Sequence, residues 1–137
     1  MSVFTEVERE KLRTGRLGRL ATVGPDGQPH VVPLTYTFNE AEDAVDVGGF
    51  GFGASKKWRD ARRNPRVTFL LDEFGDGSGY GIELRCEAEV HETGGQAINA
   101  RFPGFDPQFL RLRPRRIVTW GVEVSSTEDT SARGRDV

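Results

Sequence analysis

The sequence predicts a mostly β fold, a small and largely antiparallel barrel built as one domain over residues 1–124. Residues 82–92 alternate between apolar and polar side chains, the pattern of a strand with one buried face. About six such segments follow one another at hairpin-like spacing, separated by turns that use many of the 17 glycines. Because closing a sheet removes its exposed edges, the pattern favours a barrel with short helices between some strands.

The first half of the chain is expected to begin with a helix and to continue with three strands. Thr5 followed by Glu8 is a capping-box signature, which predicts a helix over residues 5–13. The strands are predicted over residues 15–24, 30–38 and 44–50. In the first strand, Leu17, Ala21 and Val23 are expected to share one face. Pro33 lies within the second, and since proline cannot donate to a sheet ladder, that strand should lie at an edge, a bulge or the barrel rim.

The second half begins with a helix over residues 55–63, which should end before Asn64 because a residue preceding proline usually leaves the helical region. The apolar, β-branched run that follows, residues 66–73, predicts a central strand. The remaining segments are expected to be a flexible loop (74–81), a strand (82–92), a short helix (94–102), an irregular stretch (103–114) and a last strand (115–124). Residues 125–137 contain almost no apolar side chain and are expected to be a disordered tail.

Composition argues against several kinds of partner and site. The net charge of −2 argues against a general nucleic-acid binder, and no apolar stretch is long enough to span a bilayer. The N-terminus has no secretory-signal character, so a cytoplasmic location is expected. Cys86 is the single cysteine, which rules out an intrachain disulfide. His30 and His91 stand far apart without a ligand pattern, so no metal site is predicted.

Two adjacent lysines, Lys56 and Lys57, follow Ser55 at the start of the predicted 55–63 helix. An ammonium group at the positive end of a helix dipole is unfavourable by about 0.3–1 kcal/mol. A bound phosphate reverses the sign of this effect, since it accepts hydrogen bonds from backbone N–H groups, the serine hydroxyl and both ammonium groups. The preceding glycine-rich run lets the backbone approach such a ligand closely. We therefore interpret the three residues as a phosphate site; a solvated lysine pair is the alternative.

Aromatic side chains near the predicted irregular stretch leave two interpretations open. If Phe102, Phe105 and Phe109 are buried, they seal the barrel; if exposed, they offer an apolar platform to a planar substrate or a dimer face. We favour sealing and dimerisation. His91 lies on the outward face of its strand and is expected to be solvated.

The ordered set of motifs resembles the pyridoxamine 5′-phosphate oxidase superfamily, the FMN-binding split barrels. The segment SKKWRDARRNPRV followed by TFLL is similar to that superfamily's flavin-phosphate segment, a Ser-Arg-Lys-like triplet, a short helix and Asn-Pro-Arg-Val before an apolar strand. GRLATVGPDGQPHVVPLTY upstream and RPRRIVTWG near the end occur in the matching order, so the resemblance covers residues 4–124. It implies a six-stranded antiparallel split β-barrel and a homodimer with the cofactor at the subunit interface.

Within the superfamily, the chain looks most like the branch that uses the deazaflavin coenzyme F420, and there like the OxyR-like group of actinobacteria. This resemblance implies a reductase that transfers a hydride from the reduced deazaflavin to an activated C=C of a small substrate, such as a polyketide or tetracycline-like intermediate. FMN is the alternative cofactor, because its phosphate would use the same triplet. A non-catalytic flavin or deazaflavin carrier and an unrelated β-barrel binding module are the rival interpretations.

Carried over position by position, the resemblance assigns cofactor contacts but no catalytic residue. Ser55, Lys56 and Lys57 match the phosphate triplet. The ring contacts that it implies are Pro33, Leu34, Thr35 and Tyr36 on an earlier strand, Phe50 and Gly51 before the triplet, and Trp120, which would approach the partner subunit's cofactor. Family oxidases often have Tyr-Thr at positions 50 and 51, so this chain lacks two hydroxyls. The Arg-x-His signature for pyridoxamine phosphate is absent, which argues against vitamin B6 oxidation.

Two of these aromatic residues also have a purely structural interpretation. Tyr36 could be a barrel residue with its hydroxyl at the rim, and Trp120 could be a core aromatic on a strand. For the proton that must follow a hydride, Tyr36, Tyr80 and water are the candidate donors, and the sequence does not choose among them.

Overall fold

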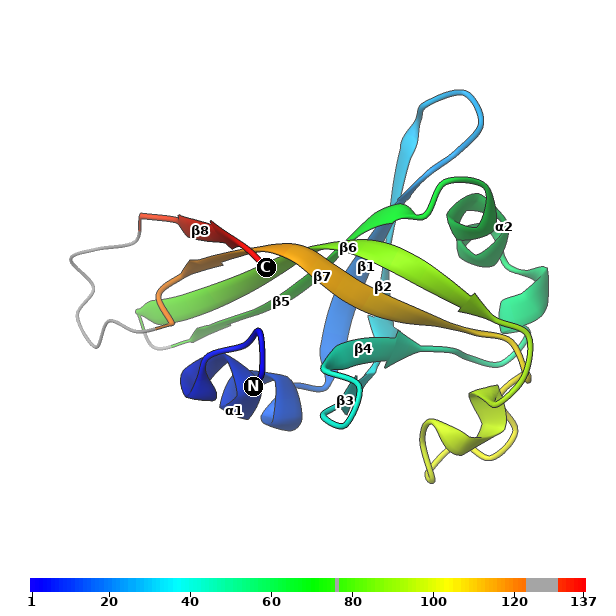
Figure 1. The fold of residues 1–137 in the computed structure, drawn as a ribbon, viewed down its shortest axis with the longest axis horizontal. Coiled ribbons are helices and arrows are strands. Elements are labelled where there is room, and N and C mark those ends of the chain that lie inside the picture. The colour runs from blue at the N-terminus through cyan, green and yellow to red at the C-terminus, as the bar shows by residue number, and fades with distance from the viewer. Residues whose placement is uncertain (76, 123–130) are drawn as a thin grey trace.

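One curled antiparallel sheet forms most of the molecule (Figure 1). The computed structural model describes residues 1–75, 77–122 and 131–137. The strands in these residues are β1 (Leu17–Val23), β2 (Pro29–Thr35), β3 (Thr37–Asn39), β4 (Ala44–Val47), β5 (Arg66–Gly75), β6 (Ser78–His91), β7 (Phe109–Trp120) and β8 (Arg133–Asp136). The sheet order is β2-β1-β5-β6-β7-β4-β3. Strand β4 pairs with residues 110–112 of β7, and β8 pairs with residues 116–119 of the same strand. Two α-helices, α1 (Glu6–Thr14) and α2 (Lys56–Arg63), and two 3-10 turns, η1 (Phe52–Ala54) and η2 (Gly95–Ala97), complete this part of the chain.

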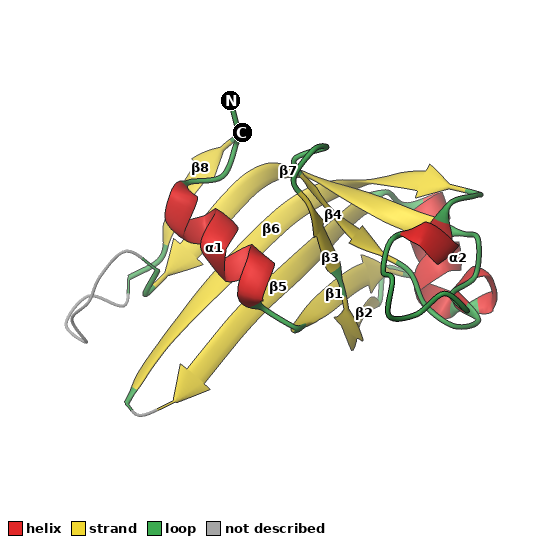
Figure 2. Cartoon of the chain, turned by 90° about the horizontal axis from the view of Figure 1, so that it is seen from below, coloured by secondary structure: helices red, strands yellow, loops and turns green. Residues whose placement is uncertain are grey.

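The two edges of the sheet come from consecutive segments of the chain. Strands β2 and β3 form opposite edges, yet only Tyr36 separates them, so the sheet curls until its edges meet there, as a half-open barrel (Figure 2). The Tyr36 hydroxyl donates a hydrogen bond of 2.8 Å to the carbonyl oxygen of Leu12, and its ring meets Phe69 edge to face at 5.0 Å. Pro33 lies on the edge strand β2, as predicted.

The barrel interior is filled mainly from the long central strands. The alternation over 82–92 is confirmed, because Ile82, Leu84, Cys86 and Ala88 are all buried. Burial also raises the pKa of the Cys86 thiol, which keeps it protonated. Leu17, Ala21 and Val23 do share one face of β1, and it is the outer one: the buried side is Gly18, Leu20 and Thr22, and Leu17 is 45% exposed. Gly18 lies inside because the Phe69 ring occupies the place where a side chain would be.

Helix α1 begins as the capping box predicts. The Thr5 hydroxyl accepts from the Glu8 amide, and the Glu8 carboxylate accepts from the Thr5 amide. Glu8 is buried and also receives two hydrogen bonds from Arg135 of β8, at 2.6 and 2.8 Å. The tail prediction is therefore wrong for residues 133–136, which form a strand held by this ion pair; residues 125–130 lie outside the described part.

The count of about six strands is corrected to eight in the described residues. The predicted 30–38 strand is divided at Tyr36, and β8 adds a strand. The loop predicted over 74–81 is instead mostly strand, since β5 extends to Gly75 and β6 begins at Ser78. Glycine misled the prediction: a Cβ at Gly81 would lie 1.9 Å from the Trp120 ring, so glycine is what lets this ring lie flat on β6.

The last part of the sheet also differs from the prediction. Strand β7 begins at Phe109, inside the stretch expected to be irregular, and the helix expected over 94–102 is only the single turn η2. Pro114 made residues 109–120 look interrupted, but the β6–β7 register shifts between Arg85 and Cys86, which accommodates the proline within the pair. In the described part of the chain, no helix has the length and apolar character needed to cross a membrane.

Candidate functional site

The N-terminus of α2 carries the predicted phosphate triplet. Ser55 is the N-cap, as predicted: its hydroxyl oxygen accepts from the Trp58 amide at 3.3 Å. The same hydroxyl donates to the Phe52 carbonyl at 2.6 Å. The hydroxyl proton of Ser55 therefore already has an acceptor within the protein, and the hydroxyl has little hydrogen-bonding capacity left for a ligand.

The two lysines of the triplet have different surroundings. The Lys56 ammonium lies 2.7 Å from a carboxylate oxygen of Asp60, one turn further along α2. Asp60 is buried, and the hydrogen bond from Lys56 lowers the pKa of its carboxyl. Lys56 therefore has an internal partner that the sequence interpretation missed, although the Lys-x-x-x-Asp spacing signals such an i,i+4 pair.

Lys57, in contrast, has no carboxylate within ion-pair distance among the described residues. It is half-buried, and its ammonium lies 5.4 Å from the centre of the Phe52 ring. Burial lowers its pKa, because the charged form loses hydration. Its charge also stands in the first turn of α2, where the helix dipole is already positive. The result is an uncompensated cation beside backbone amides that have no acceptor within the helix.

The glycine-rich segment before α2 is held by Asp106 from the loop between η2 and β7. The two carboxylate oxygens of Asp106 accept from the amides of Gly51 and Gly53, at 3.1 and 3.0 Å. Gly53 is also covered by Gln108, whose side chain lies 2.7 Å from the place of a Cβ. These two amides therefore position the segment and are not free donors for a ligand; the approach of the glycine backbone to a cofactor stays a prediction. Sequence analysis gave Asp106 no role.

Three phenylalanine rings lie next to the contact between Asp106 and the glycine-rich segment. Phe50 is 68% exposed and meets Phe105 and Phe102 edge to face, at 5.2 and 6.0 Å. Phe105 and Phe109 are buried, so these two do not form an exposed platform; neither belongs to the core cluster, and sealing of the barrel stays a prediction. Phe50 offers a free aromatic surface next to the turn at Gly51, whose φ of +63° suits glycine.

The remaining predicted contacts are not gathered at α2 within one chain. Pro33 and Thr35 are exposed on β2, and Leu34 between them packs against the core. The Tyr36 hydroxyl is engaged by Leu12, and burial raises its pKa, so its structural interpretation holds. Trp120 lies at the end of β7 opposite to α2 (Figure 1), so its predicted cofactor contact would have to be with a partner's site.

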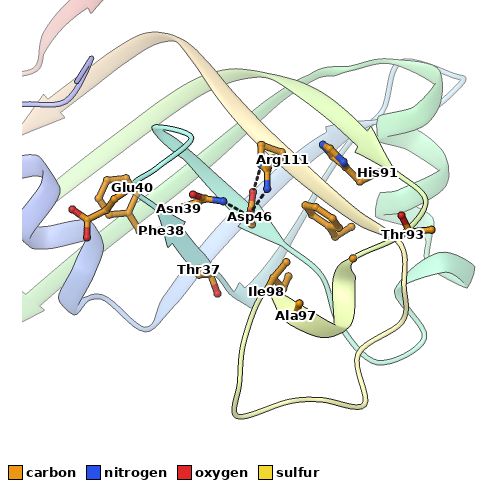
Figure 3. Close-up of a pocket in the computed structure, with 12 residues that line it drawn as sticks. Thr37, Phe38, Asn39, Glu40, Asp46, His91, Thr93, Ala97, Ile98 and Arg111 are labelled. Atoms are coloured by element: carbon orange, nitrogen blue, oxygen red, sulfur yellow. Dashed lines mark hydrogen bonds and ion pairs between the residues drawn. The ribbon is translucent and has the colours of Figure 1, made fainter. Parts of the chain in front are cut away.

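A pocket of about 510 Å³ lies between the outer side of β3, β4 and β7 and the loop that contains η2 (Figure 3). Asp46, which is 2% exposed, accepts from Arg111 at 2.9 and 3.1 Å and from Asn39 at 3.0 Å. His91 is half-buried here: its ring stacks on Phe109 at 4.5 Å and hydrogen-bonds Glu89 at 2.7 Å. The expectation of a solvated His91 is therefore wrong. The signal missed in the sequence is the single carboxylate inside the apolar run AVDV.

A half-open antiparallel barrel with a cationic helix N-terminus next to a glycine turn is the architecture of the split-barrel, flavin-type proteins. The sequence profile of the pyridoxamine 5′-phosphate oxidase family matches residues 4–121, and the chain belongs to this family. The resemblance found in the sequence is thereby confirmed.

Named relatives and solved structures agree with this assignment. The chain is 35% identical over 133 residues to a 5a,11a-dehydrotetracycline/5a,11a-dehydrooxytetracycline reductase of Streptomyces rimosus subsp. rimosus, covering 95% of this chain and 92% of the relative. The structure of the conserved hypothetical protein Rv2991 from Mycobacterium tuberculosis superposes with a TM-score of 0.72 at 25% identity, covering 95% of this chain and 96% of that one. An F420 reductase structure has the same fold, with a TM-score of 0.63 at 21% identity over 81% of this chain and 95% of that one.

Proposed function

We propose that this protein is an oxidoreductase that uses coenzyme F420 to reduce an activated C=C in a polycyclic substrate of the tetracycline class. The observation that carries the proposal is the uncompensated, half-buried ammonium of Lys57 at the N-terminus of α2. Such a charge is unfavourable in the free protein and becomes favourable when an anion binds. The substrate class follows from the tetracycline reductase to which the chain is 35% identical.

The chain's own residues fit the phosphate of such a cofactor. Lys57 supplies the charge, the amides of Lys56 and Lys57 supply donors in the first helical turn, and Asp106 holds the preceding turn in place. Phe50 supplies an exposed aromatic surface for a flat ring. When bound, reduced F420 supplies a hydride to one carbon of the substrate C=C, and the other carbon takes up a proton.

Solvent water is the proposed source of that proton. The Tyr36 hydroxyl already donates to Leu12, and burial raises its pKa. Tyr80 is buried, its hydroxyl lies 3.5 Å from a Glu73 carboxylate oxygen, and burial raises its pKa as well. Neither tyrosine is a readily available acid near neutral pH.

FMN is the second candidate cofactor, because a phosphate site at Lys57 serves either molecule. Against FMN stands the Phe50-Gly51 pair, which lacks the two hydroxyls that family oxidases often place there. A non-catalytic carrier would use the same site but would turn over no acceptor. Turnover therefore separates the enzyme from the carrier, and cofactor preference separates F420 from FMN.

We also propose that the protein works as a homodimer. The outer face of the β1–β2 edge is apolar and exposed: Val31 is 64% exposed and Leu17 45%, and Ala21 pairs directly with Val31. A second copy covering this face would bury it. In such a dimer the family resemblance implies that each Trp120 approaches the partner's cofactor. The expected result of Val31→Glu is a monomer in sedimentation velocity, and Gln28→Glu, exposed in the turn before β2, is the control.

The test of the proposed activity is turnover with reduced F420 and a dehydrotetracycline as the acceptor. Reduced FMN in place of F420 is the comparison. We expect oxidation of the deazaflavin that depends on the acceptor and is largely lost in Lys57→Gln. Equal turnover with FMN would overturn the cofactor assignment, and no turnover with either, despite tight cofactor binding, would favour the carrier.

A further inference from the structure

The pocket at Asp46 and Arg111 has none of the anion chemistry of the Lys57 site. Its charged groups are already neutralised inside the protein: Asp46 by Arg111, and Glu40, at one side, by Arg9 and Arg13 at 3.2 and 2.8 Å. An anionic ligand would face two carboxylates in this pocket, and a cationic ligand would face a guanidinium. Burying an unpaired charge is costly, so the pocket selects an uncharged molecule.

The walls of the pocket combine flat apolar surface with a few free polar groups. Ile98 and Phe109 provide the apolar surface, whereas the ring of Phe38, which also borders the pocket, packs against the core and meets Phe4 edge to face. The hydroxyls of Thr37 and Thr93 have no hydrogen-bond partner among the described residues, although both line the pocket. The other lining side chains are largely polar, so the pocket offers hydrogen-bonding groups beside one apolar wall, and pockets of roughly 300–1,000 Å³ hold drug-sized ligands.

The donor geometry favours oxygen atoms on the ligand. Both oxygens of Asp46 are occupied, so the side chain presented from β4 and β7 is Arg111, held rigid by its two-point contact. Its remaining terminal nitrogen lies 3.6 Å from Glu42, too far for a strong hydrogen bond. Arg111 therefore keeps N–H capacity for a ketone or enol oxygen, and its charge is balanced by Asp46.

The pocket is connected to the predicted cofactor site through the segment after β4. Gly48 packs against Ile98 and Phe109 of the pocket wall so closely that a Cβ there would lie 2.9 Å from Ile98. Two residues later the same segment presents the exposed Phe50. A short segment of chain therefore joins the two sites, with a ligand in the pocket at one end and the Lys57 site at the other.

We propose that this pocket binds an uncharged, planar, oxygen-bearing ring compound, and that it receives the rings of the acceptor in the proposed reaction. The second half of this statement rests on the proposed function. The first half does not, because it follows from the charge balance and the walls of the pocket. The protein would then bind the anionic group of the cofactor at Lys57 and the uncharged rings of the acceptor beside Arg111.

The first experiment measures binding without any cofactor. Prodan, an uncharged fluorescent naphthyl ketone, is titrated against the full chain, with the anionic anilinonaphthalene sulfonate as the comparison. Ala97 lines the mouth of the pocket and is exposed, so Ala97→Phe fills the pocket with little risk to folding; Gln96→Phe, next to it but outside the pocket, is the matched control. Thr93→Phe is a second filling variant, and thermal melts confirm that each variant is folded.

We expect prodan to bind about tenfold more weakly to the filling variants and unchanged to Gln96→Phe and Lys57→Ala. Equal binding to the filled and control variants, tighter binding of the anionic dye, or no prodan binding would overturn the site. In turnover with reduced F420, the filling variants should raise KM for the acceptor more than they lower kcat. An unchanged KM would refute the assignment to the acceptor, whereas absence of all turnover would count against the proposed function alone.

Discussion

Removing the Lys57 charge should weaken cofactor binding far more than removing the Lys56 charge together with its partner. The phosphate-bound state gains a charged hydrogen bond from Lys57, worth about 1.5–3 kcal/mol, and the free protein keeps a desolvated cation. Lys57→Gln should therefore raise the Kd for F420 by about 10- to 150-fold. Lys56 is neutralised by Asp60 at 2.7 Å, so the pair adds little net charge to the site.

The matched control is the double variant Lys56→Gln with Asp60→Asn. It removes both members of the ion pair and leaves no buried carboxylate without a partner. We expect its Kd to stay within about threefold of the parent. The assay is a titration that follows deazaflavin fluorescence. A deazaflavin with its ribityl chain but no phosphate should bind the parent and Lys57→Gln equally.

Two results would refute this reasoning. If the double variant lost as much affinity as Lys57→Gln, the lysines would act as an equivalent pair, as the sequence alone suggested. If Lys57→Gln bound F420 as tightly as the parent, the α2 N-terminus would not be the phosphate site.

Three further predictions concern stability and pH. Arg135→Ala leaves the buried Glu8 without its ion-pair partner and should lower the free energy of unfolding by about 1–3 kcal/mol in urea denaturation. Arg135→Lys should lower it by a smaller amount. An unchanged free energy of unfolding would mean that β8 does not hold α1. Gly81→Ala displaces the Trp120 ring and should lower the free energy of unfolding by about 1–3 kcal/mol. Gly75→Ala, with open space around it, should leave this free energy nearly unchanged. Equal effects of the two variants would contradict the close contact between Gly81 and Trp120. Hydrogen bonds from its arginine and histidine partners lower the pKa of Glu89 from 4.5 to about 2, so its stabilising effect is complete above pH 4.5 and is lost as pH falls toward 2. Glu89→Gln should flatten the dependence of stability on pH in that interval, and parallel profiles for variant and parent would refute the assignment.

The sequence predicted those parts of the fold that depend on local patterns. The α1 capping box, the α2 N-cap and the alternation of 82–92 are each decided by neighbouring residues, and each is confirmed. The errors arise where distant residues decide. Gly81 looked like part of a loop because the ring that covers it, Trp120, lies on another strand, and β8 forms because Glu8 binds a residue 127 positions away.

The candidate site was predictable in position but only in part in its internal contacts. The triplet does begin a helix, and the Lys-x-x-x-Asp spacing is a local signal of the Lys56–Asp60 pair. The two hydrogen bonds that Asp106 accepts from Gly51 and Gly53 join distant segments and have no local signal. The Asp46 pocket was missed altogether, because its walls come from β3, β4, β6, β7 and the η2 loop. The one local signal, the carboxylate inside the apolar run AVDV, marks Asp46 but not the pocket around it.

The central claim is that the first turn of α2 exists to bind the phosphate of a deazaflavin cofactor. Its most direct test is a titration of the purified parent protein with F420 and, separately, with FMN, followed by ring fluorescence. The account predicts saturable binding of F420 that competes with excess inorganic phosphate and is clearly tighter than that of FMN. Tight binding of FMN alone, or binding of neither cofactor, would contradict it.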